Sequence, residues 1–447
     1  MPYAIDLFCG AGGCSEGLIQ AGFHILFSSD ISDMVEVTYK HRHEQLGLIQ
    51  GENTWFERAD IRNLTGKEIK KHIKSLKMFK NQNNVPKIDL MIGGPSCQGF
   101  SRAGRRDKKD PRNLLFGEYV RVIKEVKPKY IVLENVEGFM DMQFLDYKGL
   151  PTKEHPNGEI YPDGTTTPVI LRKELKKIGY ETLEPRILNA ADYGVPQRRN
   201  RVIFIGYKKG LRAPQYPIPT HDSSSYLTLK DAISDLIVDD NIRNTINTGL
   251  SDYQIASRLG RTPSLITGKP IELEGKLQNL ELPSSTELVL ERFSLFNEGE
   301  SGTMLRKRVV NEGIDISKKP NLIALCSKEL LKEPDEIIKM FKQGKVSDAE
   351  VDVLLTKKNI RQRWKADEPS ATVVTIPDDY INPWEARTFS VREMARCQSF
   401  DDSFVFLGKR TTGGLKRRTE VPQCTQVGNA VPPLLAKAVC DEIMKVL

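Results

Sequence analysis

The stretch Tyr3-Ala4-Ile5-Asp6-Leu7-Phe8-Cys9-Gly10-Ala11-Gly12-Gly13-Cys14-Ser15-Glu16-Gly17 places a β-rich run directly before a glycine-rich turn and the start of a helix. Glycines permit a sharp turn and let a bound ligand approach the backbone closely. The turn is not Gly-x-Gly-x-x-Gly, because Ser15 occupies the third glycine position, and this argues against a loop that binds a dinucleotide pyrophosphate. The stretch therefore predicts a strand and a helix with a ligand site between them.

Outward from this turn, short β-rich runs alternate with longer mixed segments up to about Gly206. This rhythm is typical of βαβ units, which build a mostly parallel sheet. We predict the following strands: Tyr3–Phe8, His24–Ser28, Ile88–Ile92, Tyr130–Glu134 and Val202–Gly206. The sequence therefore predicts an α/β fold for this part of the chain.

The alternation of β-rich runs and longer segments is lost from Tyr207 to about Pro383, where Pro, Ser and Thr residues interrupt the sequence. We interpret this part as a second domain. Apolar spacing predicts helix from Ser327 to Lys358, with a buried face made of Leu330, Leu331, Ile337, Ile338, Met340 and Phe341. Near the C-terminus, Pro432 and Pro433 favour a helix start, and the apolar spacing that follows favours packing on a sheet.

Length and composition limit the class of protein. At 447 residues, with 39% hydrophobic and 28% charged residues, the chain is too long for one ordinary core, so we expect two domains or one with a large insertion. No apolar run reaches the roughly 18 residues that span a bilayer, and the N-terminus lacks the features of a signal peptide. We expect a cytoplasmic protein without a membrane segment.

The net charge of +7 is modest, but basic residues gather at Arg102–Arg112, Met304–Arg308, Lys357–Lys365 and Lys409–Arg418. Such clusters can track a phosphate backbone, although any single cluster is more often ordinary solvated surface. Their occurrence together with a catalytic-looking turn favours a nucleic-acid partner.

The seven cysteines are an odd number and include no Cys-x-x-Cys pair, so neither a disulfide framework nor a zinc site is indicated, and we expect no metal. Cys97 differs from the others, because Gly93-Gly94-Pro95-Ser96-Cys97-Gln98-Gly99-Phe100-Ser101 sets it in a tight turn directly after a predicted strand. A cysteine is most often an inert core residue. A thiol in such a turn, with Arg102, Arg105 and Arg106 close behind, is instead typical of a reactive thiolate.

Polar side chains also lie at other strand ends. Glu134 ends one predicted strand, and Gln197-Arg198-Arg199-Asn200-Arg201 precedes another. A strand-end glutamate alone is normally an ion-pair partner or a helix cap. The six histidines fall in no catalytic pattern, so a cysteine-histidine dyad lacks support. Thiol, carboxylate and guanidinium together indicate a thiol nucleophile that attacks a polar heterocycle.

Two aspartates extend the ligand site. Asp30 ends the second predicted strand, 20 residues after Gly10, where its carboxylate can accept hydrogen bonds from the ribose hydroxyls of a nucleoside. Asp60 follows Trp55-Phe56-Glu57-Arg58-Ala59 in a similar pattern and is placed to accept from an adenine amino group. Loop capping is the alternative for both, but with the glycine turn they favour a nucleoside cofactor.

With these motifs the chain resembles the DNA (cytosine-5)-methyltransferases over nearly its whole length. Asp6 to Gly17 is similar to the family's S-adenosylmethionine loop, Gly93 to Ser101 to its nucleophile loop, and Glu134-Asn135-Val136 to its acid motif. Gln197 to Arg201 resembles the arginine motif, Arg387 to Phe400 the penultimate motif, and Gly428 to Pro433 the last, all in family order. One departure is Ser96, which precedes the nucleophile where the family usually has proline.

The resemblance implies a Rossmann-like S-adenosylmethionine-dependent methyltransferase domain at 1–206, a target-recognition domain at 207–427, and a C-terminal helix at 428–447 that returns to the catalytic domain. It implies that the Cys97 thiolate attacks carbon 6 of a flipped-out cytosine while Glu134 protonates nitrogen 3. Arg201, with Arg199 in support, would hold the base. Carbon 5 would take the methyl group, leaving S-adenosylhomocysteine, and loss of the carbon-5 proton would expel the cysteine.

The resemblance also implies a cofactor pocket lined by Phe8, Gly10, Gly12, Gly13, Asp30, Ile31, Asp60, Ile61, Pro95, Leu115, Asn429 and Val431. The implied partner is double-stranded DNA. A cognate restriction endonuclease would belong to the same bacterial or phage system without needing physical contact, and the protein itself is expected to be a monomer.

Other functions stay open at this point. A tRNA cytosine-5 methyltransferase uses matching cysteine and glutamate motifs, but the chain has no Cys-Phe-Thr motif and a long segment from Tyr207 to about Val427, as expected of a domain that reads duplex DNA. A catalytically silent binding regulator has no need of Cys97, Glu134 and Arg201 together. A dinucleotide oxidoreductase is the weakest alternative.

Overall fold

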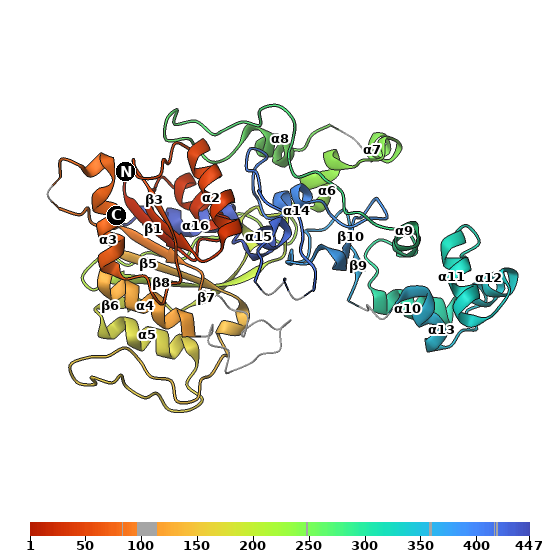
Figure 1. Cartoon of the computed structure of the whole chain (residues 1–447), viewed down its shortest axis with the longest axis horizontal. Helices are drawn as coiled ribbons and strands as arrows, with labels where there is room; N and C mark the ends of the chain where they lie inside the picture. Colours follow the sequence, from red (N-terminus) through yellow and green to blue (C-terminus); the bar gives the residue numbers. More distant parts are fainter. Residues whose placement is uncertain (83, 96–113, 247–248, 357–359, 415, 417–418) are drawn as a thin grey trace.

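The computed structural model describes residues 1–82, 84–95, 114–246, 249–356, 360–414, 416 and 419–447. One large sheet organises the first part of the chain (Figure 1). Its strands are β1 (Tyr3–Leu7), β2 (His24–Asp30), β3 (Trp55–Arg58), β4 (Leu90–Gly93), β5 (Tyr130–Asn135), β6 (Tyr180–Thr182), β7 (Arg186–Asn189) and β8 (Asn200–Lys208).

The strand order is β3-β2-β1-β4-β5-β8-β6, with β7 also paired to β8. The strands β3, β2, β1, β4 and β5 run parallel to one another, and β8 runs antiparallel to β5, β6 and β7. The mostly parallel sheet predicted from the sequence is confirmed, and every predicted strand has a counterpart whose ends differ by up to two residues. The short strands β3, β6 and β7 were not predicted, because three or four residues carry too little alternation to recognise.

Side chains that alternate along the strands supply two cores, one on each face of the sheet. Ile5, Met91 and Ile131 pack with α3 (Gly66–Ser75), α4 (Leu115–Val126) and α5 (Thr167–Lys177). Ala4 and Leu90 pack on the opposite face with α1 (Gly13–Gln20) and α16 (Pro433–Met444). The C-terminal helix begins at Pro433 and packs on the sheet as the proline pair and apolar spacing predicted.

The remaining chain is mainly helical. Its elements are α6 (Leu229–Ile233), α7 (Asp240–Ile246), α8 (Asp252–Leu259), α9 (Glu287–Phe293), α10 (Gly302–Asn311), α11 (Pro320–Leu330), α12 (Pro334–Lys342), α13 (Asp348–Leu355), β9 (Gln362–Arg363), β10 (Tyr380–Ile381), α14 (Val391–Cys397) and α15 (Gln423–Asn429). One core joins α6, α8, α14 and α15, and another joins α9 to α13. Helices α10 to α13 form a lobe that projects away from the sheet (Figure 1).

The stretch from Ser327 to Lys358, predicted as helical, is divided over its described residues among α11, α12 and α13. α11 ends before Leu331, which has a φ of 55° and is 90% exposed rather than buried. α12 begins at Pro334, because proline lacks a backbone N–H and disfavours helix at the preceding residue. α13 begins after Ser347, which forms a capping box with Glu350. Ile337, Met340 and Phe341 are buried as predicted.

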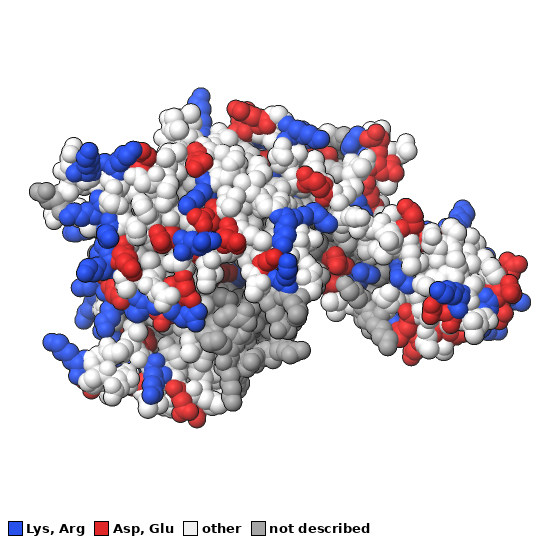
Figure 2. Space-filling view, in the orientation of Figure 1, with Lys and Arg blue, Asp and Glu red and all other residues white. Residues whose placement is uncertain are grey.

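Ion pairs reduce the free charge of the basic cluster at 304–308. Arg308 pairs with Glu300 at 2.8 Å, and Arg306 pairs with Asp352. Figure 2 shows lysine and arginine mixed with aspartate and glutamate over the lobe of α10 to α13. The cluster at 102–112 lies outside the described residues. Among the described residues, no helix combines the length and the apolar character needed to cross a membrane.

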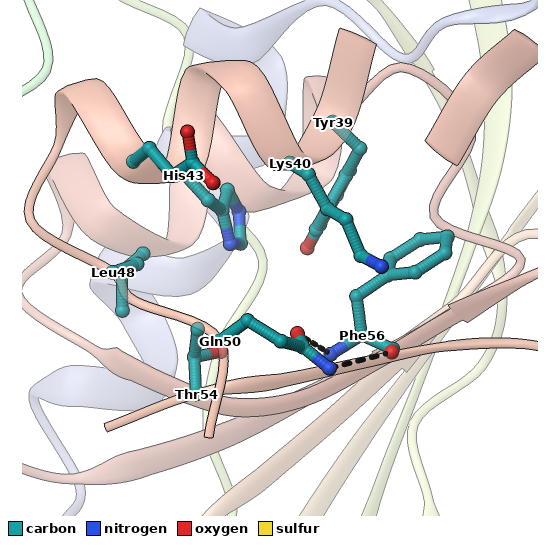
Figure 3. A pocket seen from close by; sticks show the side chains of 8 residues that line it. Tyr39, Lys40, His43, Leu48, Gln50, Thr54 and Phe56 are labelled. Atoms are coloured by element: carbon teal, nitrogen blue, oxygen red, sulfur yellow. Dashed lines mark hydrogen bonds between the residues drawn. The ribbon is translucent and has the colours of Figure 1, made fainter. Parts of the chain in front are cut away.

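A small cavity of about 10 Å³ lies between α2 (Asp33–Gln45) and β3 (Figure 3). The Gln50 side chain closes one end by accepting from the Phe56 N–H at 2.8 Å and donating to its carbonyl at 3.1 Å. His43 lines the cavity, where burial and the nearby Arg42 lower its pKa to about 3. The space is about that of one water molecule, so it cannot hold a nucleoside.

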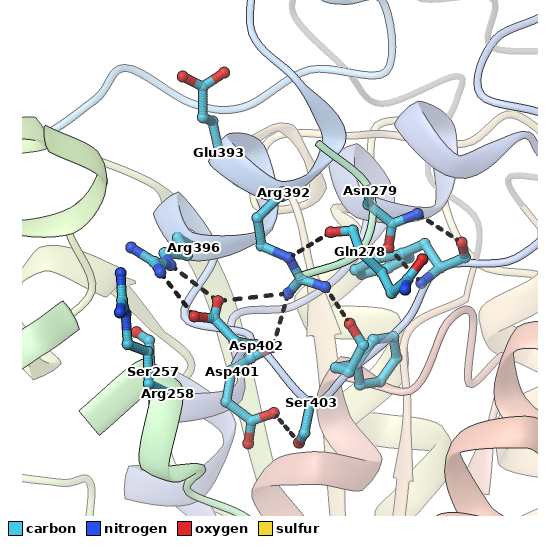
Figure 4. Close-up of polar contacts among 12 residues, drawn as sticks. Ser257, Arg258, Gln278, Asn279, Arg392, Glu393, Arg396, Asp401, Asp402 and Ser403 are labelled. Carbon is cyan, nitrogen blue, oxygen red and sulfur yellow. Dashed lines mark hydrogen bonds and ion pairs between the residues drawn. The ribbon is translucent and has the colours of Figure 1, made fainter. Parts of the chain in front are cut away.

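Buried ion pairs and hydrogen bonds connect the part of the chain that forms the sheet to the mainly helical part. Arg42 of α2 donates to both carboxylate oxygens of Glu16 in α1, at 2.8 and 2.9 Å, and to the Ser403 hydroxyl at 2.9 Å. Figure 4 shows the neighbouring pairs, in which Arg396 donates to Asp402 at 2.9 and 2.7 Å. These side chains are almost fully buried, so each charge depends on its partners for the hydrogen bonds that water would otherwise supply.

Replacing Arg42 by methionine is expected to lower the free energy of unfolding by about 3–5 kcal/mol, because Glu16 and Asp401 are left buried without their main cation. Urea denaturation followed by circular dichroism measures the change. The matched control is Lys40→Met on the same helix, where the partly exposed Lys40–Glu36 pair is worth at most about 1 kcal/mol. Equal losses in the two variants would contradict a special role for the buried pair.

Candidate active site at the carboxyl edge of the sheet

The strand register brings the candidate site residues to one edge. Leu7 at the end of β1 pairs with Ser29 and with Gly93, and Gly93 pairs with Leu133. β8 is antiparallel, so its first residues lie at this same edge, with Val202 opposite Asn135. The strand order changes direction between β1 and β4, which is where open α/β sheets bind ligands.

The turn after β1 is shaped by backbone conformations that favour glycine. Gly10 has a φ of 51° and Gly12 a φ of 103°, and Phe8 adopts a φ of 57° that ends β1 one residue before the predicted end. Gly12 is the N-cap of α1, so the N–H groups of the first helical turn face the edge of the sheet. This arrangement suits a polar or anionic ligand group.

The aspartate predicted at the end of β2 holds this turn. One oxygen of Asp30 accepts from the Gly10 N–H at 3.1 Å and the other from the Ser32 N–H at 2.9 Å. Burial raises the pKa of Asp30, although these backbone N–H groups oppose the shift. Next to it, Ile31 leaves 66% of its surface exposed, which offers an apolar face for a ring.

The residues after β3 lie beside Asp30, because the Ala59 N–H donates to the Asp30 carbonyl at 3.0 Å. Ile61 is buried in the core. Asp60 is paired with Arg62, whose Nε donates to the two carboxylate oxygens at 2.9 and 3.0 Å, and these hydrogen bonds lower the pKa of Asp60. A ligand amino group would therefore share this carboxylate with Arg62.

The segment after α15 forms the opposite side of the glycine turn. Val431 is buried against the core of α1 and α16, and Asn429 is exposed. A Cβ atom on Gly13 would lie 2.1 Å from the Val431 carbonyl oxygen, a separation that real atoms do not adopt. Residues more than 400 positions apart in the sequence therefore meet at this turn.

Gly13→Ala is expected to destabilise the protein by about 1–3 kcal/mol, because the added methyl group must displace the Val431 backbone. Urea denaturation measures the loss. Gly413→Ala is the matched control, since a Cβ there meets nothing within 4 Å and should change stability by less than about 0.5 kcal/mol. An unchanged unfolding midpoint in Gly13→Ala would show that the two segments are not in close contact.

Glu134 and Arg201 meet at the edge. The Arg201 Nε lies 2.7 Å from a Glu134 carboxylate oxygen, and the two side chains are 11% and 12% exposed. Burial raises the pKa of Glu134, while Arg201 and Arg199 lower it by a smaller amount. Glu134 therefore keeps a proton to higher pH than an ordinary glutamate, as a proton donor requires.

Arg199 does not point at the edge. Its guanidinium, 1% exposed, donates to the carbonyls of Val373 at 3.0 Å and Gly428 at 2.7 Å. The side chain therefore joins the start of β8 to the segment next to Asn429, and its charge lowers the pKa of Glu134.

The loop that leaves β4 is described as far as Pro95, whose carbonyl accepts from the Asn135 side chain at 3.1 Å. Leu115 starts α4 and packs against the core beside β4 and β5. Cys97, Ser96, Arg102, Arg105 and Arg106 lie outside the described residues. Asn135 was not predicted as a site residue, although its place directly after the strand-end acid is a signal that could have identified it.

All of the described cysteines are buried, and burial raises the pKa values of their thiols. The pKa of Cys326 rises to about 11, that of Cys424 to about 11 and that of Cys397 to about 12. None of these thiols is a good thiolate nucleophile. Among the described residues, no group of three or more histidine, cysteine or acidic side chains could hold a metal ion.

A buried chain of hydroxyl groups lies behind the glycine turn. Ser15 donates to Asp6 at 2.6 Å and also contacts the Tyr39 hydroxyl, which in turn contacts Ser28. Burial raises the pKa of Asp6 to about 7, and the hydrogen bond from Ser15 only partly opposes this shift. These contacts fix the first turn of α1 relative to β1, β2 and α2.

Comparisons with known proteins found similar sequences and a similar fold. The family model for the C-5 cytosine-specific DNA methylase matches residues 3–445. The Type II methyltransferase M.DdeI of Desulfomicrobium norvegicum is 31% identical over 98% of this chain and 88% of its own length. M1.HphI of Haemophilus parahaemolyticus is 30% identical over 99% of this chain and 86% of its own length. A solved structure described as a DNA modification methyltransferase encoded within an E. coli prophage has a TM-score of 0.60 at 21% identity, covering 100% of this chain and 99% of that chain, and supports the fold.

Proposed function

Since the chain belongs to the C-5 cytosine-specific DNA methylase family and is a DNA (cytosine-5)-methyltransferase, we propose that its carboxyl sheet edge joins a cytosine to S-adenosylmethionine. Glu134 and Arg201 lie at the same edge as the glycine turn, and this observation carries the proposal. A base bound between them would face a methyl donor held at that turn.

The residues at the turn fit S-adenosylmethionine. The N–H groups at the start of α1 suit the carboxylate of its amino-acid part, Asp30 suits the ribose hydroxyls, and the exposed Ile31 suits the adenine ring. Asn429 and Val431 would close the pocket from the other side. When bound, the cofactor supplies an electrophilic methyl group on a sulfonium, and no metal is needed for this chemistry.

We propose the following role for each catalytic side chain. The Cys97 sulfur forms a bond to carbon 6 of cytosine while Glu134 gives a proton to nitrogen 3, so electrons move toward carbon 5. Carbon 5 then forms a bond to the methyl group as the bond from that methyl group to sulfur breaks, which leaves S-adenosylhomocysteine. Loss of the carbon-5 proton forms the carbon 5–carbon 6 double bond as the bond from carbon 6 to the Cys97 sulfur breaks, and nitrogen 3 returns its proton to Glu134. Arg201 holds the base and balances the charge of the thiolate.

Duplex DNA hides carbon 6 in the base stack, so the target nucleotide must be flipped out at a cost of a few kcal/mol. We propose that residues 207–427 recognise the target sequence, residues 1–206 carry the chemistry and residues 428–447 complete the catalytic part. The projecting lobe of α10 to α13 supports this division. The Type II relatives support membership in a restriction-modification system. We further propose that a cognate endonuclease belongs to this system and that the enzyme is a cytoplasmic monomer.

The test is incubation of the purified protein with labelled S-adenosylmethionine and unmethylated genomic DNA, with tRNA in parallel. We expect label in 5-methyldeoxycytidine from DNA alone, and sequencing of the product would then give the target site. Label in tRNA alone would move the substrate to RNA. Absence of label in both would contradict the proposed reaction and favour a silent binding protein.

A further inference from the structure

The segment Gly428–Val431 contacts the glycine turn that is proposed to bind the cofactor. Its backbone carbonyls accept hydrogen bonds from side chains that are distant in the sequence. The segment begins with the last two residues of α15 and continues beyond the helix, where the Val431 carbonyl faces the backbone of Gly13. The last carbonyls of a helix lack partners within the helix and need donors from elsewhere. At α15, Arg199 donates to the Gly428 carbonyl, and a side chain at the end of another helix supplies a further donor.

The side chain at the end of the other helix is Gln398, which is the C-cap residue of α14 and is fully buried. Its amide nitrogen donates to the Val427 carbonyl at 2.7 Å and to the Ala430 carbonyl at 3.3 Å. Its amide oxygen accepts from the side chain of Gln197 at 2.9 Å. A glutamine amide offers two donor hydrogens and one acceptor oxygen, so each of these is engaged here.

Gln197 continues the connection toward the catalytic strand. It is also fully buried, and it donates to the Cys397 carbonyl at 3.1 Å and accepts from the Val373 N–H at 2.8 Å. It lies four positions before Arg201 and two before Arg199, whose guanidinium holds the Gly428 carbonyl. The side chains of Gln197, Arg199 and Gln398 therefore connect the start of β8 to the segment that meets Gly13.

We propose that Gln398 is a positioning residue that holds Gly428–Val431 against the glycine turn and thereby sets the affinity for the cofactor. The inference rests on the proposed function, because it assumes that S-adenosylmethionine binds at this turn. Gln398 itself touches neither substrate. Its loss removes the Gln398 donor from the buried Ala430 carbonyl and one of two donors from the Val427 carbonyl, which also accepts from the Ala430 N–H at 3.2 Å.

The test uses Gln398→Met in the full chain, which keeps the length of the side chain and removes its amide. Calorimetric titration with S-adenosylhomocysteine is expected to show a Kd raised about tenfold, as one or two lost hydrogen bonds imply. The Kd for duplex DNA should change by less than about threefold, since the segment faces the cofactor turn. Amide hydrogen exchange at residues 427–431 should accelerate in the ligand-free protein.

Gln254→Met is the matched control, because Gln254 is equally buried and donates to the Lys230 carbonyl at 3.2 Å and the Ser234 hydroxyl at 2.9 Å, away from the turn. It should lower the melting temperature by a similar amount without raising the Kd for S-adenosylhomocysteine. Equal Kd values in Gln398→Met and the unaltered protein would overturn the inference, as would equal increases in both variants. Failure of the unaltered protein to bind S-adenosylhomocysteine would overturn the proposed function together with the inference.

Discussion

Cys97→Ala is expected to lower the rate of methyl transfer by about 10³-fold or more, because carbon 6 of cytosine then has no nucleophile. The thiols of the other cysteines cannot substitute for it, since they are buried and their pKa values are raised. The measurement is transfer of labelled methyl groups to DNA in single-turnover conditions. The variant should still bind S-adenosylhomocysteine, because the glycine turn and Asp30 are unchanged.

A second measurement detects the covalent bond between the Cys97 sulfur and carbon 6 of the cytosine. With DNA that carries 5-fluorocytosine, carbon 5 has no proton to lose after methylation, so the enzyme should remain covalently attached and migrate with DNA on a denaturing gel. Cys97→Ala should form no such band. Cys326→Ala, a buried cysteine in the core of the lobe, is the control and should form it whenever the protein is folded. A persistent band in Cys97→Ala would assign the nucleophile to another residue.

Glu134→Gln is expected to reduce kcat by about 10²–10³-fold, the range for loss of one positioned proton donor. Glutamine keeps the shape of the side chain but carries no transferable proton, and it removes the charge that pairs with Arg201 at 2.7 Å. KM for S-adenosylmethionine should change little, because the glycine turn and Asp30, which are proposed to hold the cofactor, are unchanged.

The pH profile separates proton donation from simple positioning. Burial raises the pKa of Glu134, so the protonated form persists above the range of an ordinary glutamate and is lost as the pH rises through that pKa. The logarithm of kcat for the unaltered enzyme should fall across this range, and that for Glu134→Gln should stay level. Glu118→Gln, at a partly exposed ion pair with Arg121 on α4, is the control and should keep kcat within about twofold. An unchanged kcat in Glu134→Gln would remove Glu134 from the chemistry.

The strand ends that form the site edge were largely predictable, because the sequence patterns that mark them involve only neighbouring residues. An apolar run of four to six residues that ends in a glycine turn or an acid marks both a strand and the place where it stops, as at Leu7, Gly93 and Glu134. The helix boundaries within the lobe of α10 to α13 were harder to predict from the sequence. The apolar stripe from Leu330 to Phe341 continues in sequence across Pro334, but the chain cannot remain helical there.

By itself, the sequence determined the α/β class, the family motifs in their order and the residue types available for chemistry, because these depend on runs of neighbouring residues. Only the tertiary structure decided which groups meet. Arg199 directly precedes β8 and Arg201 is its second residue, yet one holds the Gly428 carbonyl and the other the Glu134 carboxylate. Gln398 reaches the segment beside Gly13 from a different helix. Such contacts follow from strand order, the close approach of backbones and the direction of each side chain, and no local pattern encodes those three properties.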